Sequence, residues 1–396
     1  MKPLTGKRQR FFIGRMECIF ERYGTSMKKI ITVSVISELT TDQRVLRICT
    51  TLVEMGFEVR LIGRRFGDSL KLGDYPFHAE RIRCFFRKGF MQFAEFNTRL
   101  FFKLLFAKTD YLLANDLDAL APNYLVAKWR KKMLFYDTHE YYTGVSALRN
   151  SPFKRRVWKW MEDRIFPKLK IVYTVNESVK NKYQAEYGNQ IAVVRNVPVT
   201  KHVDPLPLPD RWKGKTVLLM QGMGMHPGRG GLELLEIMKY LPDNYFLVYI
   251  GGGNEWEKIA AMRHEWKLDD RVEMIPKLGP ELLQQYTPLA QLGMSLDGFE
   301  DLNHWFTLPN KLFDYLHAGV PVAASAIPEV KTIIEQYQCG FCFISRDPQN
   351  MAEEIMQLMN DQQRYEALKM NALEAAKELC WENERHKLTA LYEPYL

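Results

Sequence analysis

The alternation of apolar and polar stretches along the chain predicts two successive series of strands and helices. The first series begins with a β-branched run at residues 30–36, passes through an amphipathic segment at 45–55, and returns to an apolar run at 57–63. A strand, a helix and a second strand within about 33 residues are typical of a βαβ unit with a right-handed crossover. Further apolar runs of strand length lie at residues 111–114, 133–136, 171–174 and 191–194.

A change of composition at residues 199–215 separates the first series from the second. Prolines stand at alternate positions there and helical periodicity is absent, as is usual in an interdomain linker. The later apolar runs lie at residues 216–220, 246–250, 272–275, 292–296 and 321–325, followed by helical sequence at 349–379 and 382–392. The pattern predicts an α/β protein with two Rossmann-like, doubly wound domains whose carboxyl strand ends face a common cleft.

Length and composition agree with this organisation. The chain has 396 residues, 46% of them hydrophobic, which suits two domains of roughly 180 residues each. It has no apolar run of the ~18 residues that a transmembrane helix needs, and the basic residues 1–27 lack the apolar core of a secretory signal. Six scattered cysteines are typical of free thiols, so we expect a cytoplasmic location. The sequence leaves open whether the native protein begins at Met1 or at Met27.

The net charge of +8 favours anionic partners such as nucleotide phosphates, nucleic acid or an anionic membrane surface. Neither a zinc-finger nor a helix-turn-helix pattern is present, so we do not expect nucleic acid. Residues 85–90 and 99–106 mix aromatic and basic side chains. One interpretation is a peripheral contact with the inner face of a membrane. The alternative is a domain helix that buries its apolar face in the core.

A glycine-rich stretch at residues 221–231 lies between an expected strand and an expected helix. Its candidate donor-binding positions are Gly222, Gly224, Gly228 and Gly230. Glycines let backbone N–H groups approach a phosphate closely, and the helix N-terminus adds a positive dipole. Arg229 stands at the helix start, where it can neutralise a diphosphate. A second glycine loop contains Gly252, which could pack against a base or a phosphate. The alternative for both loops is an ordinary turn.

The stretch at residues 308–322 predicts a loop, a helix, a glycine stop and a strand. Pro309 suits the first turn of a helix, and the free amides of that turn suit a phosphate. Lys311 adds positive charge, and Asn310, Lys311 and Asp314 can share one helix face. The Asp314 carboxylate can accept hydrogen bonds from a ribose diol. The alternative is a capped surface helix.

Polar residues in the first half of the chain follow expected strands and should therefore face the cleft. The candidates are Asp42, Arg44, Asp116, Asp118, His139 and Glu140. His139 suits a hydrogen bond to a sugar hydroxyl or a proton transfer. A lone histidine is more often structural, but this one stands between acidic residues at a strand end.

Several motifs together resemble the retaining GT-B glycosyltransferases of family 4, the group 1 type. Residues 42–45 resemble the family's D-x-R-V, and residues 221–230 resemble its Q-G-x(5)-G-R-G diphosphate loop. Residues 309–315, with the sequence PNKLFDY, resemble its P-N-K-L-F-E-Y segment. The resemblance extends over nearly the whole chain from about residue 28.

The resemblance implies a sugar transferase whose donor is a UDP- or GDP-sugar and whose acceptor is a glycan or a lipid-linked molecule, as in cell-surface polysaccharide or glycoconjugate synthesis. It implies no metal and no other cofactor. Arg229 and Lys311 would stabilise the departing diphosphate, Asp314 would bind the ribose, and His139 would face the transferred sugar. Residues 28–200 would form the acceptor domain, with the helix at 380–396 packed back on it. Residues 211–379 would form the donor domain.

The sequence departs from the family pattern at two places. Phe306 stands where the family often has the first acid of an E-x7-E pair, and Met223 stands in place of a usual arginine. Asp297, Glu300 and Asp301 are nearby acids that could substitute for the first. Two alternatives to a transferase therefore remain: a nucleotide-sugar epimerase of the GT-B fold, and a binding protein with a decayed site.

Overall fold

The computed structural model describes residues 28–67, 69–145, 148, 151–222, 225–299 and 302–396. The expected basic extension at 1–27 lies outside these residues. Two parallel sheets, of seven and six strands, dominate the fold. Their strand orders are β3-β2-β1-β4-β5-β6-β7 and β10-β9-β8-β11-β12-β13, so both have the doubly wound order with a switch point beside the first strand. The predicted fold class is confirmed.

The first sheet contains each strand expected from the apolar runs and one that the pattern did not indicate. Its strands are β1 Ile30–Ser34, β2 Glu58–Arg65, β3 His78–Arg83, β4 Tyr111–Asn115, β5 Met133–Thr138, β6 Ile171–Thr174 and β7 Ile191–Val193. The additional strand is β3, whose sequence HAERIR is polar. It lies at the sheet edge, where one side of the strand needs no apolar neighbour.

Helices cover both faces of this sheet. They are α2 Gln43–Glu54, α3 Gly89–Phe106, α4 Leu117–Arg130, α6 Pro152–Ile165 and α7 Glu177–Tyr187. Helix α2 packs on one face together with the last helix of the chain, α16 Trp381–Tyr392. Tyr392 stacks on Phe135 of β5 with 4.2 Å between ring centroids, and Trp381 Nε1 donates to Thr51 Oγ1 of α2 over 3.1 Å.

The second sheet is built in the same way. Its strands are β8 Thr216–Gly222, β9 Tyr245–Gly251, β10 Val272–Pro276, β11 Leu292–Ser295, β12 Val322–Ala324 and β13 Gly340–Cys342. Its helices are α8 Gly231–Ile237, α9 Trp256–Glu265, α10 Pro280–Tyr286, α12 Asn310–His317, α13 Pro328–Tyr337, α14 Pro348–Asn360 and α15 Gln362–Glu378. Short 3-10 helices lie at Tyr142–Gly144, Phe166–Lys168, Asp210–Trp212, Thr287–Leu289 and Glu393–Tyr395.

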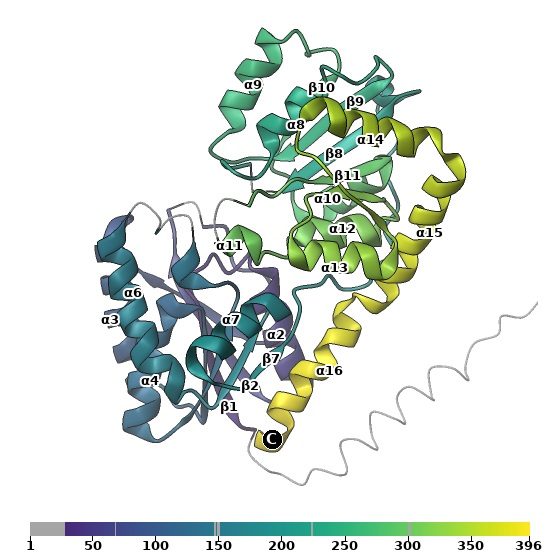
Figure 1. Cartoon of the computed structure of the whole chain (residues 1–396). Helices are drawn as coiled ribbons and strands as arrows, with labels where there is room; N and C mark the ends of the chain where they lie inside the picture. Colours follow the sequence, from purple (N-terminus) through teal and green to yellow (C-terminus); the bar gives the residue numbers. More distant parts are fainter. Residues whose placement is uncertain (1–27, 68, 146–147, 149–150, 223–224, 300–301) are drawn as a thin grey trace, which may run out of the picture.

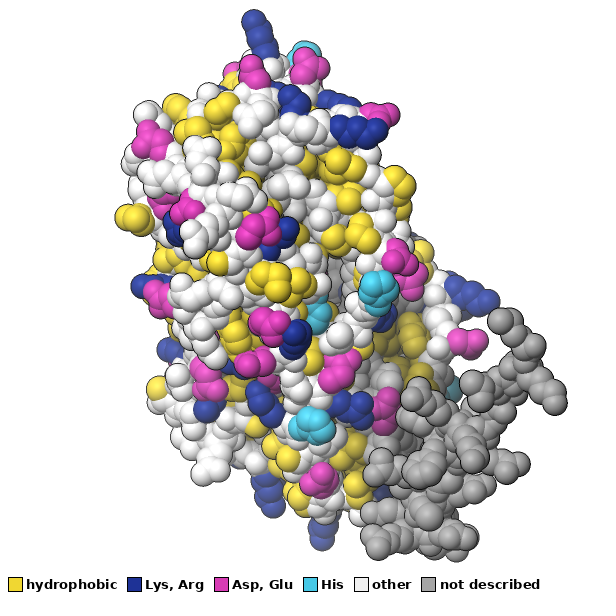
Figure 2. All heavy atoms as spheres, turned by 90° about the vertical axis from the view of Figure 1, so that its right-hand side faces the viewer, with side chains coloured by type: hydrophobic (Ala, Val, Ile, Leu, Met, Phe, Trp, Pro, Cys, Tyr) yellow, Lys and Arg dark blue, Asp and Glu magenta, His cyan; other side chains and the backbone are white. Residues whose placement is uncertain are grey.

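Figure 1 shows the two domains with the short helix α11, Leu302–Trp305, between them and α16 running from the second domain onto the first. On the face drawn in Figure 2, basic and acidic side chains are interspersed, so the basic excess of the chain is not concentrated there. Among the helices of the described residues, none has the length and apolar character to cross a bilayer.

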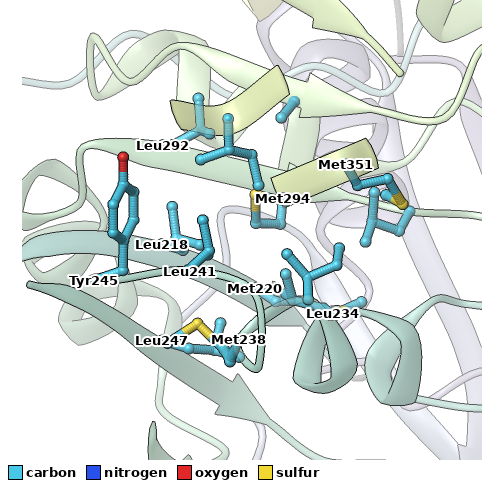
Figure 3. Close-up of a cluster of buried hydrophobic side chains, with 14 of the residues drawn as sticks. Leu218, Met220, Leu234, Met238, Leu241, Tyr245, Leu247, Leu292, Met294 and Met351 are labelled. Atoms are coloured by element: carbon cyan, nitrogen blue, oxygen red, sulfur yellow. The ribbon is translucent and has the colours of Figure 1, made fainter. Parts of the chain in front are cut away.

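Buried apolar side chains on both faces hold each sheet to its helices. Figure 3 shows one such cluster in the second domain, where Leu218 and Met220 of β8 meet Leu234 of α8 and Met351 of α14. These side chains are at most 2% exposed. The packing fixes the direction of β8, and therefore the position of the glycine loop that follows it.

Candidate active site

The carboxyl ends of β4 and β5 bring polar residues side by side. Asn115 and Asp137 are register partners in this parallel pair, and the Asp116 N–H donates to the Asp137 carbonyl over 2.8 Å. Asp116 has a φ of 60°, which is costly for a residue other than glycine and persists only where surrounding contacts impose it. One such contact is the His139 N–H, which donates to Asp116 Oδ1 over 2.8 Å.

The His139 imidazole lies between two carboxylates. Its Nδ1 is 3.0 Å from Asp116 Oδ2, and its Nε2 is 3.1 Å from Asp137 Oδ2. Burial alone would lower the pKa of this imidazole, but the two carboxylates outweigh burial and raise the pKa well above its usual value. The two carboxylates therefore favour the protonated, positively charged form of the ring. Because both nitrogens are engaged, a proton shuttle through His139 would require one of these contacts to break.

The Arg44 guanidinium binds the Asp137 carboxylate and is not a free cation in the cleft. Its Nε and Nη2 donate to the two Asp137 carboxylate oxygens over 2.9 and 2.7 Å, and its Nη1 donates to the Val194 carbonyl over 2.8 Å. Arg44 and His139 hold the pKa of the buried Asp137 below its usual value, although burial opposes this. Asp42 also has a structural role, because its side chain caps α2 by accepting a hydrogen bond from the Val45 N–H over 3.1 Å.

Two further predicted acids, Asp118 and Glu140, lie in surroundings that favour the protonated form. Burial and the neighbouring Asp116 carboxylate raise the pKa of Asp118 well above its usual value and that of Glu140 to about 7. Glu140 also bridges the domains, because its Oε2 accepts from Asn303 Nδ2 of α11 over 2.9 Å. The cleft therefore contains one carboxyl that titrates near neutral pH and makes a contact between the domains.

The glycine loop of the second domain lies directly against the end of β11. Gly230 has a φ of +76°, and a Cβ built on it would lie 2.3 Å from the Leu296 Cβ, so the loop cannot accept a side chain there without moving. Gly252 follows β9 and accepts from the Met225 N–H over 3.2 Å. Gly222 ends β8. Gly224 and Met223 lie outside the described residues.

The two predicted phosphate cations share one buried counter-ion. Arg229 Nη1 lies 2.6 Å from Asp297 Oδ1, and Lys311 Nζ lies 3.6 Å from Asp297 Oδ2. Lys311 and Arg229 hold the pKa of Asp297 below its usual value against the effect of burial, while burial lowers the pKa of Lys311. Two cations and one carboxylate leave a formal charge of +1. The nearby acid noted in the sequence is thus a partner of the cations.

The predicted helix is present as α12 and begins at Asn310, with Pro309 as its N-cap rather than in its first turn. Asn310 Oδ1 accepts from Asn196 Nδ2 of the first domain over 3.0 Å, which is a second contact between the domains. Asp314 accepts from Gln221 Nε2 over 3.2 Å, and burial raises its pKa to about 6. It lines a hollow of about 280 Å³ beside the linker, which also contains His317.

A cavity of about 250 Å³ lies between the domains and gathers many of the predicted residues. From the first domain it is lined by Asp42, Arg44, His139 and Glu140, and from the second by Arg229 and Asn310. Gly228 and Gly230 line an adjoining hollow of about 520 Å³ instead. Asp116, Asp118, Lys311 and Asp314 are not among the residues that line the interdomain cavity.

Three residues at this site were not singled out by the sequence patterns. Asn303 binds Glu140, and Asn176 Nδ2 donates to the Phe306 carbonyl over 2.7 Å. Arg346 lines the hollow beside Gly228 and donates to the Asp297 carbonyl over 3.1 Å. Asn176 carries a local signal, since it is the N-cap of α7. Asn303 and Arg346 carry none, because their partners are distant in the sequence.

Phe306, which replaces the first acid of the family pair, lies at the domain interface. Its ring packs edge-on against Tyr141 of the first domain, with 6.2 Å between centroids. Together with the Asn176 bond to its carbonyl, this contact links the two domains next to the cavity. An apolar contact between the domains thus occupies the position where the family often has a carboxylate.

Comparisons with known proteins agree with the two-domain architecture around a cleft. Over 93% of this chain and 99% of the other, the fold matches the sucrose-phosphate synthase of Thermosynechococcus elongatus, with a TM-score of 0.75 and 16% identity. Anabaena HepE in complex with UDP and glucose matches over 92% of this chain and 100% of its own, with a TM-score of 0.70 and 14% identity.

A third solved structure, from Listeria monocytogenes and described as a UDP-N-acetylglucosamine 2-epimerase, matches with a TM-score of 0.62 and 14% identity over 93% of this chain and 97% of its own. At these identities the likenesses establish the fold, which is that of the GT-B class. A search of curated protein sequences gave no match.

Family models identify the two halves of the chain separately. Residues 42–197 match the model named Glycosyltransferase Family 4, and residues 227–375 match the model named Glycosyl transferases group 1. The chain therefore belongs to the group 1 glycosyltransferases of the GT-B fold, and the resemblance seen in its motifs is confirmed.

Proposed function

We propose that this glycosyltransferase moves a sugar, with retention of configuration, from a UDP- or GDP-sugar to a glycan or lipid-linked acceptor in the synthesis of a cell-surface polysaccharide or glycoconjugate. One observation carries the proposal: the interdomain cavity places His139 and Glu140 opposite Arg229 and the start of α12. HepE, whose structure contains UDP and glucose, has the same fold and supports a nucleotide-sugar donor.

In this proposal the second domain, residues 211–379, binds the donor. Arg229, Lys311 and the free amides at Asn310 hold the diphosphate, and their charge stabilises it as it leaves. These protein cations supply the charge that a metal would otherwise provide. Gly222, Gly224, Gly228, Gly230 and Gly252 are the glycines proposed for donor binding, and Asp314, which lines the hollow beside the linker, is proposed to bind the ribose.

The first domain, residues 28–200 with α16 packed on it, binds the acceptor. His139, charged and held by Asp116 and Asp137, forms the wall next to the transferred sugar. The acceptor hydroxyl attacks on the face from which the diphosphate departs, and its proton passes to the departing phosphate oxygen. No side-chain nucleophile takes part. Asp42, Arg44 and Glu140 shape this side of the cavity, and Asp118 belongs to the same side without lining the cavity.

Transfer to a lipid-linked acceptor would take place at the inner surface of the membrane, which the protein would contact peripherally. Helix α3 buries Phe96, Leu100 and Leu104 in the core, as expected for a domain helix with its apolar face turned inward. Phe90, however, is 60% exposed and Phe106 is 81% exposed. The exposed aromatic side chains and the basic residues beside them suit an anionic bilayer.

Calorimetric titration of UDP and GDP tests the donor site. Replacing Arg229 with alanine should weaken binding of the matching nucleotide by roughly 1.5–3 kcal/mol, the scale of a hydrogen bond to a charged group. The matched control is Arg211→Ala, an exposed arginine in the same domain whose Nη2 donates to the Asp269 carbonyl. Equal affinities for wild type and Arg229→Ala would contradict the assignment.

Product analysis tests the reaction itself. An α-linked donor should yield an α-linked product, which the anomeric proton coupling in an NMR spectrum reports. Incubation with donor alone distinguishes the epimerase alternative, because only an epimerase would convert the donor sugar without an acceptor. A decayed site would neither bind nor turn over any UDP- or GDP-sugar.

A further inference from the structure

A further hollow, of about 1050 Å³, lies wholly in the first domain. Five of its lining residues are arginines: Arg64, Arg65, Arg83, Arg87 and Arg99. It is separate from the proposed donor site with Arg229 and Lys311, which belongs to the second domain. The concentration of guanidinium groups is unlike the mixed charges on the face in Figure 2.

Most of these arginines lack an acidic partner. Among the described residues, only Arg99 of the five forms an ion pair, with its Nε 2.9 Å from Glu95 Oε1. Arg64 is 3% exposed and donates to the neutral oxygens of Gln92 and the Phe86 backbone over 2.7 and 2.6 Å. The Nε of Arg64 has no hydrogen-bond partner in the described structure. Among the residues that the structure describes, Glu95 is the one acid paired with these five arginines, so positive charge is in excess there.

The sheet places two of these cations directly side by side. Arg65 of β2 and Arg83 of β3 are register partners on neighbouring parallel strands. Like charges on adjacent strands repel and lower the stability of the pairing. A bound anion between them would be attracted to both guanidinium groups and would relieve this repulsion.

The loop that contains Phe85 and Phe86 is held in place beside these arginines, because Glu95 Oε2 accepts from the N–H groups of both residues over 2.8 and 2.9 Å.

Guanidinium groups match the geometry of phosphate, which they can bind through two parallel hydrogen bonds. Phe85 lines the hollow and is 84% exposed, which suits an apolar chain, and Phe90, three residues after Arg87 in the sequence, is 60% exposed. We propose that this arginine pocket binds the phosphate or diphosphate group of a lipid-linked acceptor. This inference rests on the proposed transfer function and specifies which chemical class of acceptor the enzyme takes.

The location of the arginine pocket agrees with that role. Arg65 and Arg83 are at the carboxyl ends of β2 and β3, the same sheet edge at which His139 follows β5. Strands β2 and β5 are three neighbours apart in the sheet, with β1 and β4 between them. At about 4.8 Å per neighbour, roughly 14 Å separates the strand ends. A phosphate in the pocket and a sugar hydroxyl beside His139 can therefore belong to one acceptor molecule.

The test compares farnesyl diphosphate, inorganic diphosphate and UDP as calorimetric probes of the full chain. The variant is Arg83→Gln/Arg87→Gln, which changes two exposed side chains. Its matched control is Lys128→Gln/Lys131→Gln, which removes the same charge from another basic hollow of the first domain, of about 420 Å³. Wild type should bind farnesyl diphosphate in the presence of saturating UDP, and more tightly than it binds inorganic diphosphate.

The arginine variant should bind farnesyl diphosphate about tenfold or more weakly, as expected for the loss of charge-assisted hydrogen bonds, while its UDP affinity stays unchanged. Displacement of farnesyl diphosphate by UDP would overturn the proposal, and so would an equal loss of affinity in the lysine control. Equal affinity for farnesyl diphosphate and inorganic diphosphate would overturn the lipid part of it.

A vesicle experiment separates a bound lipid phosphate from a general membrane surface. Vesicles of phosphatidylcholine with phosphatidylglycerol that recruit wild type but not the arginine variant, without any binding of farnesyl diphosphate, would assign the hollow to the bilayer and overturn the proposal. If the proposed function is wrong, the wild type should bind no UDP- or GDP-sugar at the donor site, while farnesyl diphosphate still binds to the arginine pocket.

Discussion

Replacing Glu140 with glutamine should change how the stability of the protein depends on pH. The carboxyl of Glu140 has a pKa raised from 4.5 to about 7 by burial and by the Asp116 carboxylate. Glutamine keeps the oxygen that accepts from Asn303 Nδ2, so the contact between the domains can persist. The variant therefore removes the titration while retaining the hydrogen bond.

The sign of the effect follows from proton binding. Between pH values of about 4.5 and 7 the folded protein keeps a proton on Glu140 that the unfolded chain releases, so rising pH favours the unfolded state. Each pKa unit corresponds to about 1.4 kcal/mol, so a fully ionised Glu140 costs the folded state on the order of 3 kcal/mol. The wild type should lose about 2 kcal/mol relative to the variant between about pH 5 and about pH 7.5.

Urea denaturation of both proteins at a series of pH values measures this difference directly, because other titrating groups largely cancel between them. Glu281→Gln, at an exposed glutamate in the first turn of α10, is the matched control and should give a flat difference over the same range. A difference between wild type and Glu140→Gln that does not vary with pH would refute the reasoning. It would mean that Glu140 is ionised in the cleft at all these pH values.

Three further variants test other parts of the site. Arg44→Met should lower the free energy of unfolding by about 3–5 kcal/mol in urea titrations, since it leaves the Asp137 carboxylate buried without its cation; a loss below ~1 kcal/mol would contradict this. Asp297→Asn should tighten UDP binding measured by calorimetry, because Arg229 loses its counter-ion, and unchanged or weaker binding would count against a role of Arg229 in holding the diphosphate. Asp314→Ala should weaken binding of UDP more than of inorganic diphosphate, and equal losses would exclude a contact with the ribose.

The arrangement of charge distinguishes the two sides of the cleft. On the side proposed to bind the donor, Arg229 and Lys311 share one carboxylate and remain cationic overall. On the side proposed to bind the acceptor, Asp116 and Asp137 enclose His139 and raise its pKa, which favours the protonated ring. The net positive charge of Arg229, Lys311 and Asp297 is the feature on which the proposed electrostatic stabilisation of a diphosphate depends.

Local sequence rules were sufficient for much of the fold. The β-branched runs, the glycine after α2 and the proline before α12 each act through the backbone of a few neighbouring residues, so they predict elements without knowledge of the rest of the chain. The glycine loop with Arg229 and the start of α12 could be recognised for the same reason. The residues that mark each of these motifs lie within a few positions of one another in the sequence.

The sequence by itself determined two α/β domains, a glycine loop and a helix start suited to phosphate. Only the tertiary structure decided that Arg44 binds Asp137, that Asp297 pairs with both donor-side cations, and that the edge strand β3 completes an arginine pocket. These contacts join residues far apart in the chain, and parallel crossovers bring strand ends together irrespective of sequence distance. Local sequence patterns do not indicate such long-range pairings, so the partner of each charged side chain can be identified only from the tertiary structure.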